Sequence, residues 1–314
     1  MSERPRVLIT GIGGYIGSHL AQQLVESCEV SGIDLRAQPA LPCPQTQMDI
    51  RDPALAALLR RDRISHVVHL AAVLEDSGDR QRDYDIDVNG TRNVVEACLA
   101  SGVRHLTVTS SGAAYGYHAD SPAWLDEQHP LRGNVEFAYS DHKRQVEELL
   151  ADYRARAPQL QQLVLRPGTV LGANTRNLIT NLFARKRLLA IRGSDSPFVF
   201  IWDQDVINII REGVLGNRTG IYNLAGDGAL PIRRLAELLD KPVLTLPAWV
   251  LRLALRMGRW TGLGRYGPEQ IDFLRYRPVL ANRRLKEEFG YTPLKTSEQT
   301  FLYYLAHARA RGDL

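Results

Sequence analysis

A tyrosine and a lysine four residues apart are the strongest candidates for acid–base chemistry in this chain. Tyr139 and Lys143 lie in YSDHK, where helical periodicity begins, so both side chains project from one face of the expected helix. A cation beside a phenol favours the phenolate and lowers its pKa from about 10, which makes a general base. Tyr291 and Lys295 have the same spacing, but Pro293 between them argues against a shared helical face. We expect Tyr291 to be a packing residue.

Two serine hydroxyls are candidates to assist this base. Ser110 and Ser111 end the run HLTVTSS, which predicts a strand, and the carboxyl ends of parallel strands meet the ligand crevice of an open α/β sheet. A hydroxyl there can hydrogen-bond a substrate oxygen while the proton moves to or from Tyr139. Either serine alone is typical of a turn, so the prediction depends on the other motifs.

A glycine-rich loop near the start of the chain predicts a pyrophosphate site. RVLITGIGGYIGSHL reads as a strand, a tight turn and a helix, which presents backbone N–H groups and a positive helix end to phosphate. Ile16 breaks the pattern G-x-G-x-x-G, and the spacing that fits is Gly11, Gly14 and Gly17. Gly13 is then an extra glycine that serves the turn.

The acid that ends the second expected strand indicates which dinucleotide binds. Asp34 ends EVSGID, where a carboxylate bonds the adenosine ribose hydroxyls and repels a 2′-phosphate. We therefore expect NAD rather than NADP, although Arg36 is placed to attract a 2′-phosphate. Asp49, in MDIRD, is a candidate contact for the adenine amino group, with a loop acid or helix cap as the alternative.

The elements that position these residues alternate between short β-branched runs and helical periodicity. This alternation predicts an α/β fold with a Rossmann-type, doubly wound parallel sheet. Between the strands we expect helices near 15–27, 52–61, 80–101 and 137–156. The loop 38–47 reads as an irregular connection.

The alternation of strand and helix patterns changes after Gly172, which indicates a second, smaller lobe. We place an NAD-binding domain at 1–170, to which later strands within 198–225 return, and a partly interleaved C-terminal substrate lobe at 171–197 and 226–314. A helix near 176–187 is expected at the start of this lobe.

The composition restricts the class of protein. The 314 residues suffice for a large core, and the three cysteines are too few for a disulfide framework or a zinc site, so we expect no metal and a cytoplasmic location. The net charge of +4 comes from scattered arginines without a nucleic-acid-binding motif. We therefore expect a small-molecule substrate and no nucleic acid.

The longest apolar stretch, 242–257, is too interrupted to span a membrane. Pro247, Arg252 and Arg256 divide it. We expect a strand or loop and then an amphipathic helix with its arginines outward, and contact with a membrane surface is the alternative. The face expected to be buried comprises Val250, Leu253, Ala254 and Met257.

Taken in this order, the motifs resemble the extended short-chain dehydrogenase/reductase (NAD-dependent epimerase/dehydratase) family, which includes nucleotide-sugar epimerases, dehydratases and 3β-hydroxysteroid dehydrogenases. The resemblance runs nearly end to end through TGIGGYIG, HLAA, DVNGTRNVVEAC, TSSGAAYG, YSDHK, LRPGTVLG, FIWDQDV and YNLAG. It implies catalytic roles for Ser111, Tyr139 and Lys143, with Lys143 also on the nicotinamide ribose and Asn89 supporting the site. The other cofactor contacts that it implies are Tyr15, Ile16, Ile50, Leu70, Ala71, Ala72 and Pro167.

Departures from the family pattern bear on the reaction and the substrate. Gly112 and Ala113 stand where dehydratases and decarboxylases carry acids, so we expect simple hydride transfer between a secondary alcohol and NAD. Thr169 replaces an asparagine, and Phe198 an arginine, that commonly serve the diphosphate of a sugar nucleotide. An apolar ring there suggests a less anionic substrate.

Three functions stay open at this point. The first is an epimerase or dehydrogenase of a nucleotide-linked sugar, with Asn177-Leu178 on the uridine side and Arg275 or Arg277 supplying charge. The second is a dehydrogenase of an apolar alcohol such as a sterol, and the third is an NAD-bound sensor or scaffold. The family implies a homodimer through helices 80–101 and 137–156. The expected substrate contacts are Ser111, Gly112, Ala113, Thr169, Asn177 and Phe198.

Overall fold

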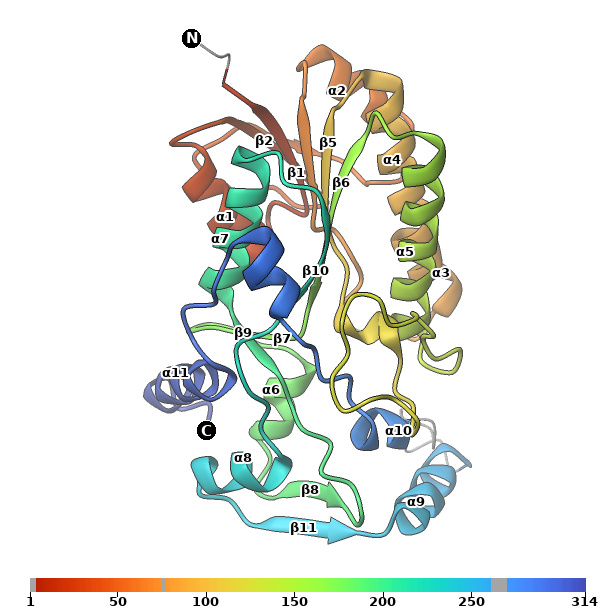
Figure 1. The fold of residues 1–314 in the computed structure, drawn as a ribbon, viewed down its shortest axis with the longest axis vertical. Coiled ribbons are helices and arrows are strands. Elements are labelled where there is room, and N and C mark those ends of the chain that lie inside the picture. The colour runs from red at the N-terminus through yellow and green to blue at the C-terminus, as the bar shows by residue number, and fades with distance from the viewer. Residues whose placement is uncertain (1–3, 75–76, 261–269) are drawn as a thin grey trace.

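The computed structural model describes residues 4–74, 77–260 and 270–314, and its main sheet confirms the expected α/β fold. Seven strands pair in parallel in the order β10, β6, β5, β4, β1, β2, β3 (Figure 1). Their bounds are β1 Arg6–Thr10, β2 Glu29–Asp34, β3 Gln45–Gln47, β4 His66–His69, β5 His105–Thr109, β6 Gln161–Pro167 and β10 Gly220–Leu224.

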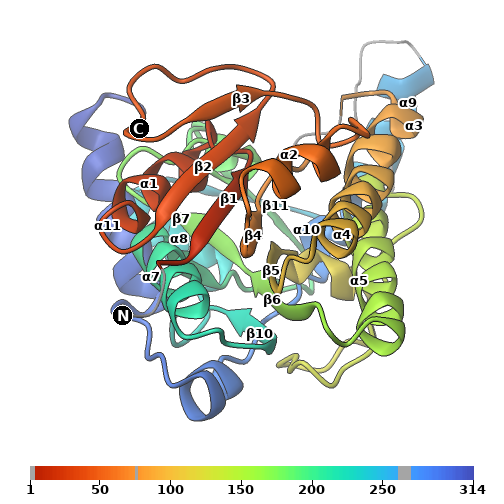
Figure 2. The same cartoon turned by 90° about the horizontal axis from the view of Figure 1, so that it is seen from above.

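Helices cover both faces of this sheet (Figure 2). On one face α1 (Tyr15–Leu24) packs against α7 (Asp203–Leu215). On the other face lie α2 (Leu55–Arg61), α4 (Gly90–Ser101) and α5 (Ala138–Arg156). The helix expected at 80–101 consists of α3 (Arg80–Tyr84), a π-helical turn at Asp85–Asn89 and α4. Apolar residues of α4 and α5, among them Val94 and Leu150, belong to the same buried cluster as Leu106 of β5.

The order of the strands places a ligand crevice between β1 and β4. The chain runs from β1 to β2 on one side and later returns to β4 on the other, so the loops after β1 and β4 diverge at the carboxyl edge of the sheet. Gly11 follows β1 and Leu70 follows β4. The glycine loop therefore lies at the topological switch point.

The C-terminal elements lie beyond the carboxyl ends of the strands (Figure 1). They build a separate apolar cluster that includes Phe183, Phe198, Phe200 and Phe301. Two small parallel sheets pair β7 (Thr169–Leu171) with β9 (Phe200–Trp202) and β8 (Leu188–Ile191) with β11 (Val243–Leu246). The helices are α6 (Leu178–Phe183), α8 (Ile232–Leu239), α9 (Ala248–Trp260), α10 (Gln270–Arg275) and α11 (Ser297–Ala310), whereas a π turn at Leu285–Phe289 packs against β10 in the core of the main sheet.

The structure differs from the sequence-based predictions at β9, at β3 and at the end of α6. Of the two strands expected to return to the main sheet, β10 does so, but β9 pairs with β7 because its neighbour Phe198 is tied to Leu230 in the aromatic cluster. The loop 38–47 ends in the edge strand β3. The helix expected at 176–187 ends at Phe183, because residues 188–191 extend to pair with β11.

The stretch 242–257 does form a strand and then a helix, but the helix does not bury the expected face. Leu253, Ala254 and Met257 are exposed, and Val250 is only half-buried. The reason is that α9 lies at the edge of the molecule, where it packs against α10. Within the described ranges, no helix is both long and apolar enough to cross a bilayer.

Candidate functional site

The glycine loop packs tightly against its own protein. A Cβ at Gly11, whose φ is +70°, would lie 2.9 Å from the backbone nitrogen of Ala71, and a Cβ at Gly17 would lie 2.4 Å from the Gly11 carbonyl oxygen. Contacts this short exclude any side chain. At Gly14 the nearest atom is 3.2 Å away and the residue is exposed. Gly11 and Gly17 therefore serve the turn and the packing of α1, whereas Gly14 faces the crevice.

The open end of α1 and the carboxylate of Asp34 fit a dinucleotide. Gly14 is the N-cap and supplies no side chain, so N–H groups of the first turn, at Tyr15 and Ile16, are left for a pyrophosphate. Asp34 accepts the Gly13 N–H (2.9 Å) and the Arg36 N–H (3.2 Å), which fixes its carboxylate at the end of β2. The Arg36 side chain is exposed beside it.

Tyr15 contributes to this loop through its backbone rather than its ring. Its hydroxyl donates to Asp203 Oδ2 at the start of α7 (2.5 Å). Burial and this carboxylate raise the pKa of Tyr15 to about 12. The side chain expected among the cofactor contacts therefore ties the loop to α7.

On the adenine side, the expected residues belong to one polar chain. Asp49 pairs with Arg51 (2.7 Å), which also pairs with Asp85 (2.6 Å). Asp85 in turn accepts a hydrogen bond from Asn89 Nδ2 (3.0 Å). Ile50 is buried beneath these groups. The remaining expected contacts, half-buried at the ends of β4 and β6, are Leu70, Ala71, Ala72 and Pro167.

The catalytic candidates lie at the start of α5 and in the turn that packs against it. Lys143 is buried, and its Nζ lies 5.7 Å from the centre of the half-buried Tyr139 ring. Ser111 Oγ accepts the Ala113 N–H (3.1 Å), so its proton is left to donate. The Ser140 hydroxyl donates to the Ala113 carbonyl (2.6 Å) and joins the two segments.

Buried charges behind Lys143 were missed by the sequence analysis. Burial alone would raise the pKa of Asp87, but His142 and Lys143 lower it overall, so Asp87 is an anion beside the lysine. His69 bonds Thr10 (2.7 Å), and burial, with Lys143 adding to it, lowers the pKa of His69 to about 4. The lysine therefore lies beside one anion, Asp87, and one neutral histidine, His69. The sequence feature that could have pointed to Asp87 is its place at the start of the motif DVNGT.

Ser110 does not lie with the catalytic candidates. Its hydroxyl donates to Glu147 (2.5 Å), and Glu147 forms a buried ion pair with Arg166 (2.6 Å). Arg166 Nη1 also donates to the Tyr115 hydroxyl (2.7 Å). Ser110 is therefore part of a structural network, and of the two hydroxyls only Ser111 remains a candidate.

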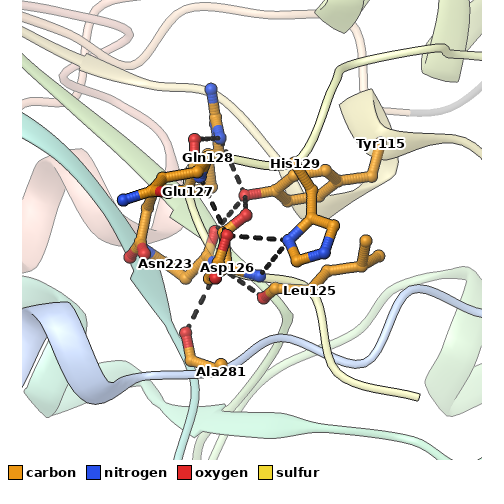
Figure 3. A network of polar contacts seen from close by, with 9 residues as sticks. Tyr115, Leu125, Asp126, Glu127, Gln128, His129, Asn223 and Ala281 are labelled. Carbon is orange, nitrogen blue, oxygen red and sulfur yellow. Dashed lines mark hydrogen bonds and ion pairs between the residues drawn. The ribbon is translucent and has the colours of Figure 1, made fainter. Parts of the chain in front are cut away.

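The same network fixes the loop that leads from the serine turn to α5. Tyr115 donates to the Asp126 carbonyl (2.9 Å), and Asn223 Nδ2, at the end of β10, donates to the Leu125 carbonyl (2.9 Å) (Figure 3). Tyr115 and Asn223 come from the motifs TSSGAAYG and YNLAG. Their role is to hold the loop that carries Tyr117.

An aromatic cavity of about 600 Å³ adjoins Tyr139. The ring of Phe137 lies 6.3 Å from Tyr139 and 5.6 Å from Phe273, measured between ring centres. Tyr117 and Tyr276 also line the cavity, and α9 contributes Arg252. Segments more than 100 residues apart in the sequence therefore line this cavity, which also contains the carboxylates of Glu136 and Asp272.

Arg277 is a half-buried cation at the edge of this aromatic group. Its guanidinium stacks on Phe198 (3.8 Å) and lies 5.4 Å from Phe273. It donates to the carbonyl and hydroxyl of Ser196, whereas its Nε has no hydrogen-bond partner. Burial lowers the pKa of Arg277 to about 10, although Tyr117 raises it. Among the described residues, no carboxylate forms an ion pair with it.

Two of the expected substrate contacts are used elsewhere. Phe198 is buried and stacks on Phe200 (5.7 Å), and its open face is covered by Arg277. Asn177 caps α6, where its Oδ1 accepts two backbone N–H groups in a capping box. Neither side chain is free in this structure to contact a substrate.

Of the other residues expected to contact the substrate, Gly112 and Ala113 lie in crowded surroundings, whereas Thr169 remains partly accessible. A Cβ at Gly112 would lie 2.9 Å from Leu280 Cδ1, and Ala113 is buried. Thr169 is half-buried at the start of β7. The guanidinium of Arg275, the alternative cation, stacks on Tyr276 (4.6 Å).

Comparison with known proteins agrees with this geometry. An uncharacterized protein of Mycobacterium tuberculosis is 26% identical over 332 residues, covering 99% of this chain and 86% of that protein. The N-acetyl-alpha-D-glucosaminyl-diphospho-ditrans,octacis-undecaprenol 4-epimerase of Escherichia coli O157:H7 is 30% identical over 179 residues, 56% of this chain and 52% of that protein. The fold is similar to Bordetella bronchiseptica WbmG in complex with NAD and UDP, with a TM-score of 0.76 and 20% identity over 99% of this chain and 96% of that one.

The family itself follows from a direct match. The model of the NAD dependent epimerase/dehydratase family matches residues 7–200, from β1 to β9. This range includes the glycine loop, Asp34, Ser111, Tyr139 and Lys143. The chain therefore belongs to the NAD dependent epimerase/dehydratase family, whose cofactor, NAD, is the one that the glycine loop and Asp34 predict.

Proposed function

We propose that this protein transfers a hydride between NAD and a secondary alcohol of a diphosphate-linked sugar, as an epimerase or a dehydrogenase. The observation that carries the substrate class is Arg277, a half-buried guanidinium whose buried Nε has no hydrogen-bond partner and which has no carboxylate partner among the described residues. A partly buried, uncompensated cation is unfavourable, and a diphosphate would supply both negative charge and hydrogen-bond acceptors. The E. coli relative, which acts on a diphospho-sugar, and the UDP-bound Bordetella structure support the same class.

In this proposal three side chains handle the proton. The Tyr139 phenolate takes the proton of the substrate hydroxyl, and Ser111 donates a hydrogen bond to the same oxygen. Lys143 stabilises the phenolate and holds the nicotinamide ribose, while the anionic Asp87 lies beside the lysine. NAD, when bound, would supply the hydride acceptor for this chemistry.

The buried positions after Ser111 support hydride transfer without elimination. Gly112 and Ala113 carry no acid, and Leu280 leaves no room for a side chain at Gly112. The ketone formed by oxidation would either leave as the product or turn and be reduced from its opposite face. The second outcome is epimerisation.

The aromatic cavity gives the second candidate function a specific basis. Tyr117, Phe137 and Phe273 would suit a sterol or another apolar alcohol. Such a substrate would leave Arg277 uncompensated, so we favour the diphosphate. The serine, tyrosine and lysine argue against a scaffold without turnover. A homodimer and a cytoplasmic location stay predictions.

Binding of UDP and of inorganic pyrophosphate to the NAD-loaded protein tests the proposed function. Arg277→Met keeps apolar bulk on Phe198 but removes the charge, so affinity for both probes should fall about 10- to 100-fold in titration calorimetry, since hydrogen bonds to charged groups contribute ~1.5–3 kcal/mol. Arg275→Met is the matched control and should change affinity little. Unchanged affinity in Arg277→Met, or NADH formation from a 3β-hydroxysterol without binding of either probe, would contradict the diphosphate.

A further inference from the structure

Apolar side chains are exposed at the end of the molecule formed by β8, β11 and α9, at the bottom of Figure 1. We call this region the distal surface. On α9, Trp249, Leu253 and Met257 are 67%, 53% and 57% exposed, and their spacing of four residues places them along one helix face. On the small sheet, Leu189 and Leu244 are register partners and are 36% and 41% exposed.

The segments that build the distal surface are basic, and the acids next to β11 are Glu237 and Asp240, at the end of α8. The segments 178–193 and 241–257, which contain β8, β11 and most of α9, include no Asp or Glu. Among the described residues, Arg252 is the one cation of these segments that forms an ion pair, with Asp272 of α10 at 3.8 Å. The cations of the two segments are Arg185, Lys186, Arg187, Arg192, Lys241, Arg252 and Arg256.

We propose that the distal surface docks on a membrane that contains anionic lipid. Exposed Trp and Leu side chains on a helix with arginines beside them fit the boundary between head groups and acyl chains. Each basic residue near an anionic bilayer adds to the electrostatic attraction. A second copy of the chain would instead bring the same seven cations against these, which opposes self-association.

The docked orientation also selects a source for the substrate, and this step rests on the proposed function. Arg252 of α9 and Phe273 of α10 line the cavity that adjoins Tyr139, so the substrate side of the crevice lies next to the distal surface. A nucleoside and a membrane lipid can both carry a diphospho-sugar. A carrier lipid would present the diphosphate to Arg277 from the membrane, and we infer that the carrier is a lipid.

Co-sedimentation of the full, NAD-loaded protein with vesicles tests the docking. Vesicles contain phosphatidylcholine alone or with about 30% phosphatidylglycerol, and the anionic ones should bind at least about tenfold more protein, less so in high salt. Trp249→Ser/Leu253→Ser should weaken binding by about tenfold or more, because two exposed apolar side chains are lost. The matched control, Leu215→Ser/Leu302→Ser, removes exposed leucines from α7 and α11 and should bind as the wild type does.

Three outcomes would overturn the docking. The wild-type protein stays in the supernatant with anionic vesicles, the two double variants bind equally well, or sedimentation equilibrium shows a dimer that only Trp249→Ser/Leu253→Ser dissociates. The last result would assign the distal surface to a second copy. None of these three outcomes depends on the binding of UDP or pyrophosphate, so failure of the docking is distinguishable from failure of the proposed function.

Turnover then separates the two carriers. With an N-acetylhexosamine on polyprenyl diphosphate in anionic vesicles, the wild-type protein should be at least about tenfold more efficient than with the same sugar on UDP, and Trp249→Ser/Leu253→Ser should lose this preference. Equal or greater efficiency with the UDP-sugar would overturn the lipid carrier.

Discussion

The two sides of the ligand crevice are built in different ways. The cofactor side depends on backbone geometry: Gly11 and Gly17 approach neighbouring backbone atoms too closely for a side chain, and Asp34 is held by N–H groups. The substrate side depends on side chains that come together only in the fold, with Phe137 and Arg277 from segments far apart. A backbone constraint restricts which residue can occupy a position, whereas a pocket lined by side chains can be formed by many combinations of residues.

The largest expected effect tests the residue where the two sides meet. Tyr139→Phe should lower kcat by about 10²- to 10⁴-fold, the usual contribution of a general acid–base group, because the ring remains but the phenolic oxygen that takes the proton is removed. NAD content after purification should stay unchanged. Turnover is measured with whichever diphospho-sugar the wild-type protein converts, and an active variant with normal NAD content would remove Tyr139 from the mechanism.

This contrast explains what the sequence could predict. The sheet, the helices on its faces and the cofactor depend on periodicity and on short contiguous motifs, which single segments reveal. TGIGGYIG and Asp34 lie within one β–α–β unit, and both lie where the motif analysis expects them. Tyr139 and Lys143 share one helix, so their proximity also follows from spacing.

The substrate side could not be predicted in the same way. Phe198 faces the core and Asn177 caps a helix, because the aromatic cluster and the capping geometry are tertiary features that no local pattern determines. Ser110 is adjacent to Ser111, but the alternation of a strand sends its side chain to Glu147. The burial expected for α9 also failed, because helical periodicity identifies an apolar face without saying what covers it.

The next largest effect is on the pH dependence of stability. It concerns His69, which is buried between β1 and α4 on the cofactor side. Its pKa is about 4 in the fold, against about 6.5 when unfolded, so the neutral form is favoured in the folded state. This contribution to stability is complete above about pH 6.5 and is lost as the pH falls toward 4, to a total of roughly 3 kcal/mol.

Unfolding in denaturant at several pH values measures this loss. His69→Gln should make the free energy of unfolding depend less on pH between 6.5 and 4, whereas His307→Gln, on α11, should follow the wild type. Equal slopes in all three proteins would show that the interior of the cofactor side does not titrate as its burial predicts.

A smaller effect tests whether the glycines serve the fold or only the ligand. Gly17→Ala places a Cβ 2.4 Å from the Gly11 carbonyl oxygen, and relief requires the backbone to move, at a cost of about 1–3 kcal/mol in the free energy of unfolding without NAD. Gly14→Ala meets the same oxygen at 3.2 Å and should cost less. If the two variants lose equal stability, close packing does not explain the requirement at Gly17.

The smallest effect addresses the choice between two cofactors that differ by one phosphate. Asp34→Asn keeps an acceptor for the Gly13 N–H but removes the charge that repels a 2′-phosphate, so the ratio of NADP to NAD affinity should rise about tenfold. Calorimetric titration of both cofactors gives this ratio, and Asp49→Asn, whose carboxylate is paired with Arg51, is the control. A ratio that stays constant in Asp34→Asn would show that other residues determine the selectivity for NAD.

If the exposed Arg36 binds the 2′-phosphate in Asp34→Asn, the double variant Asp34→Asn/Arg36→Ala should lose the gain in NADP affinity. The choice between NAD and NADP would then depend on side chains, as the substrate side does, and it would be the one part of the cofactor side that does so.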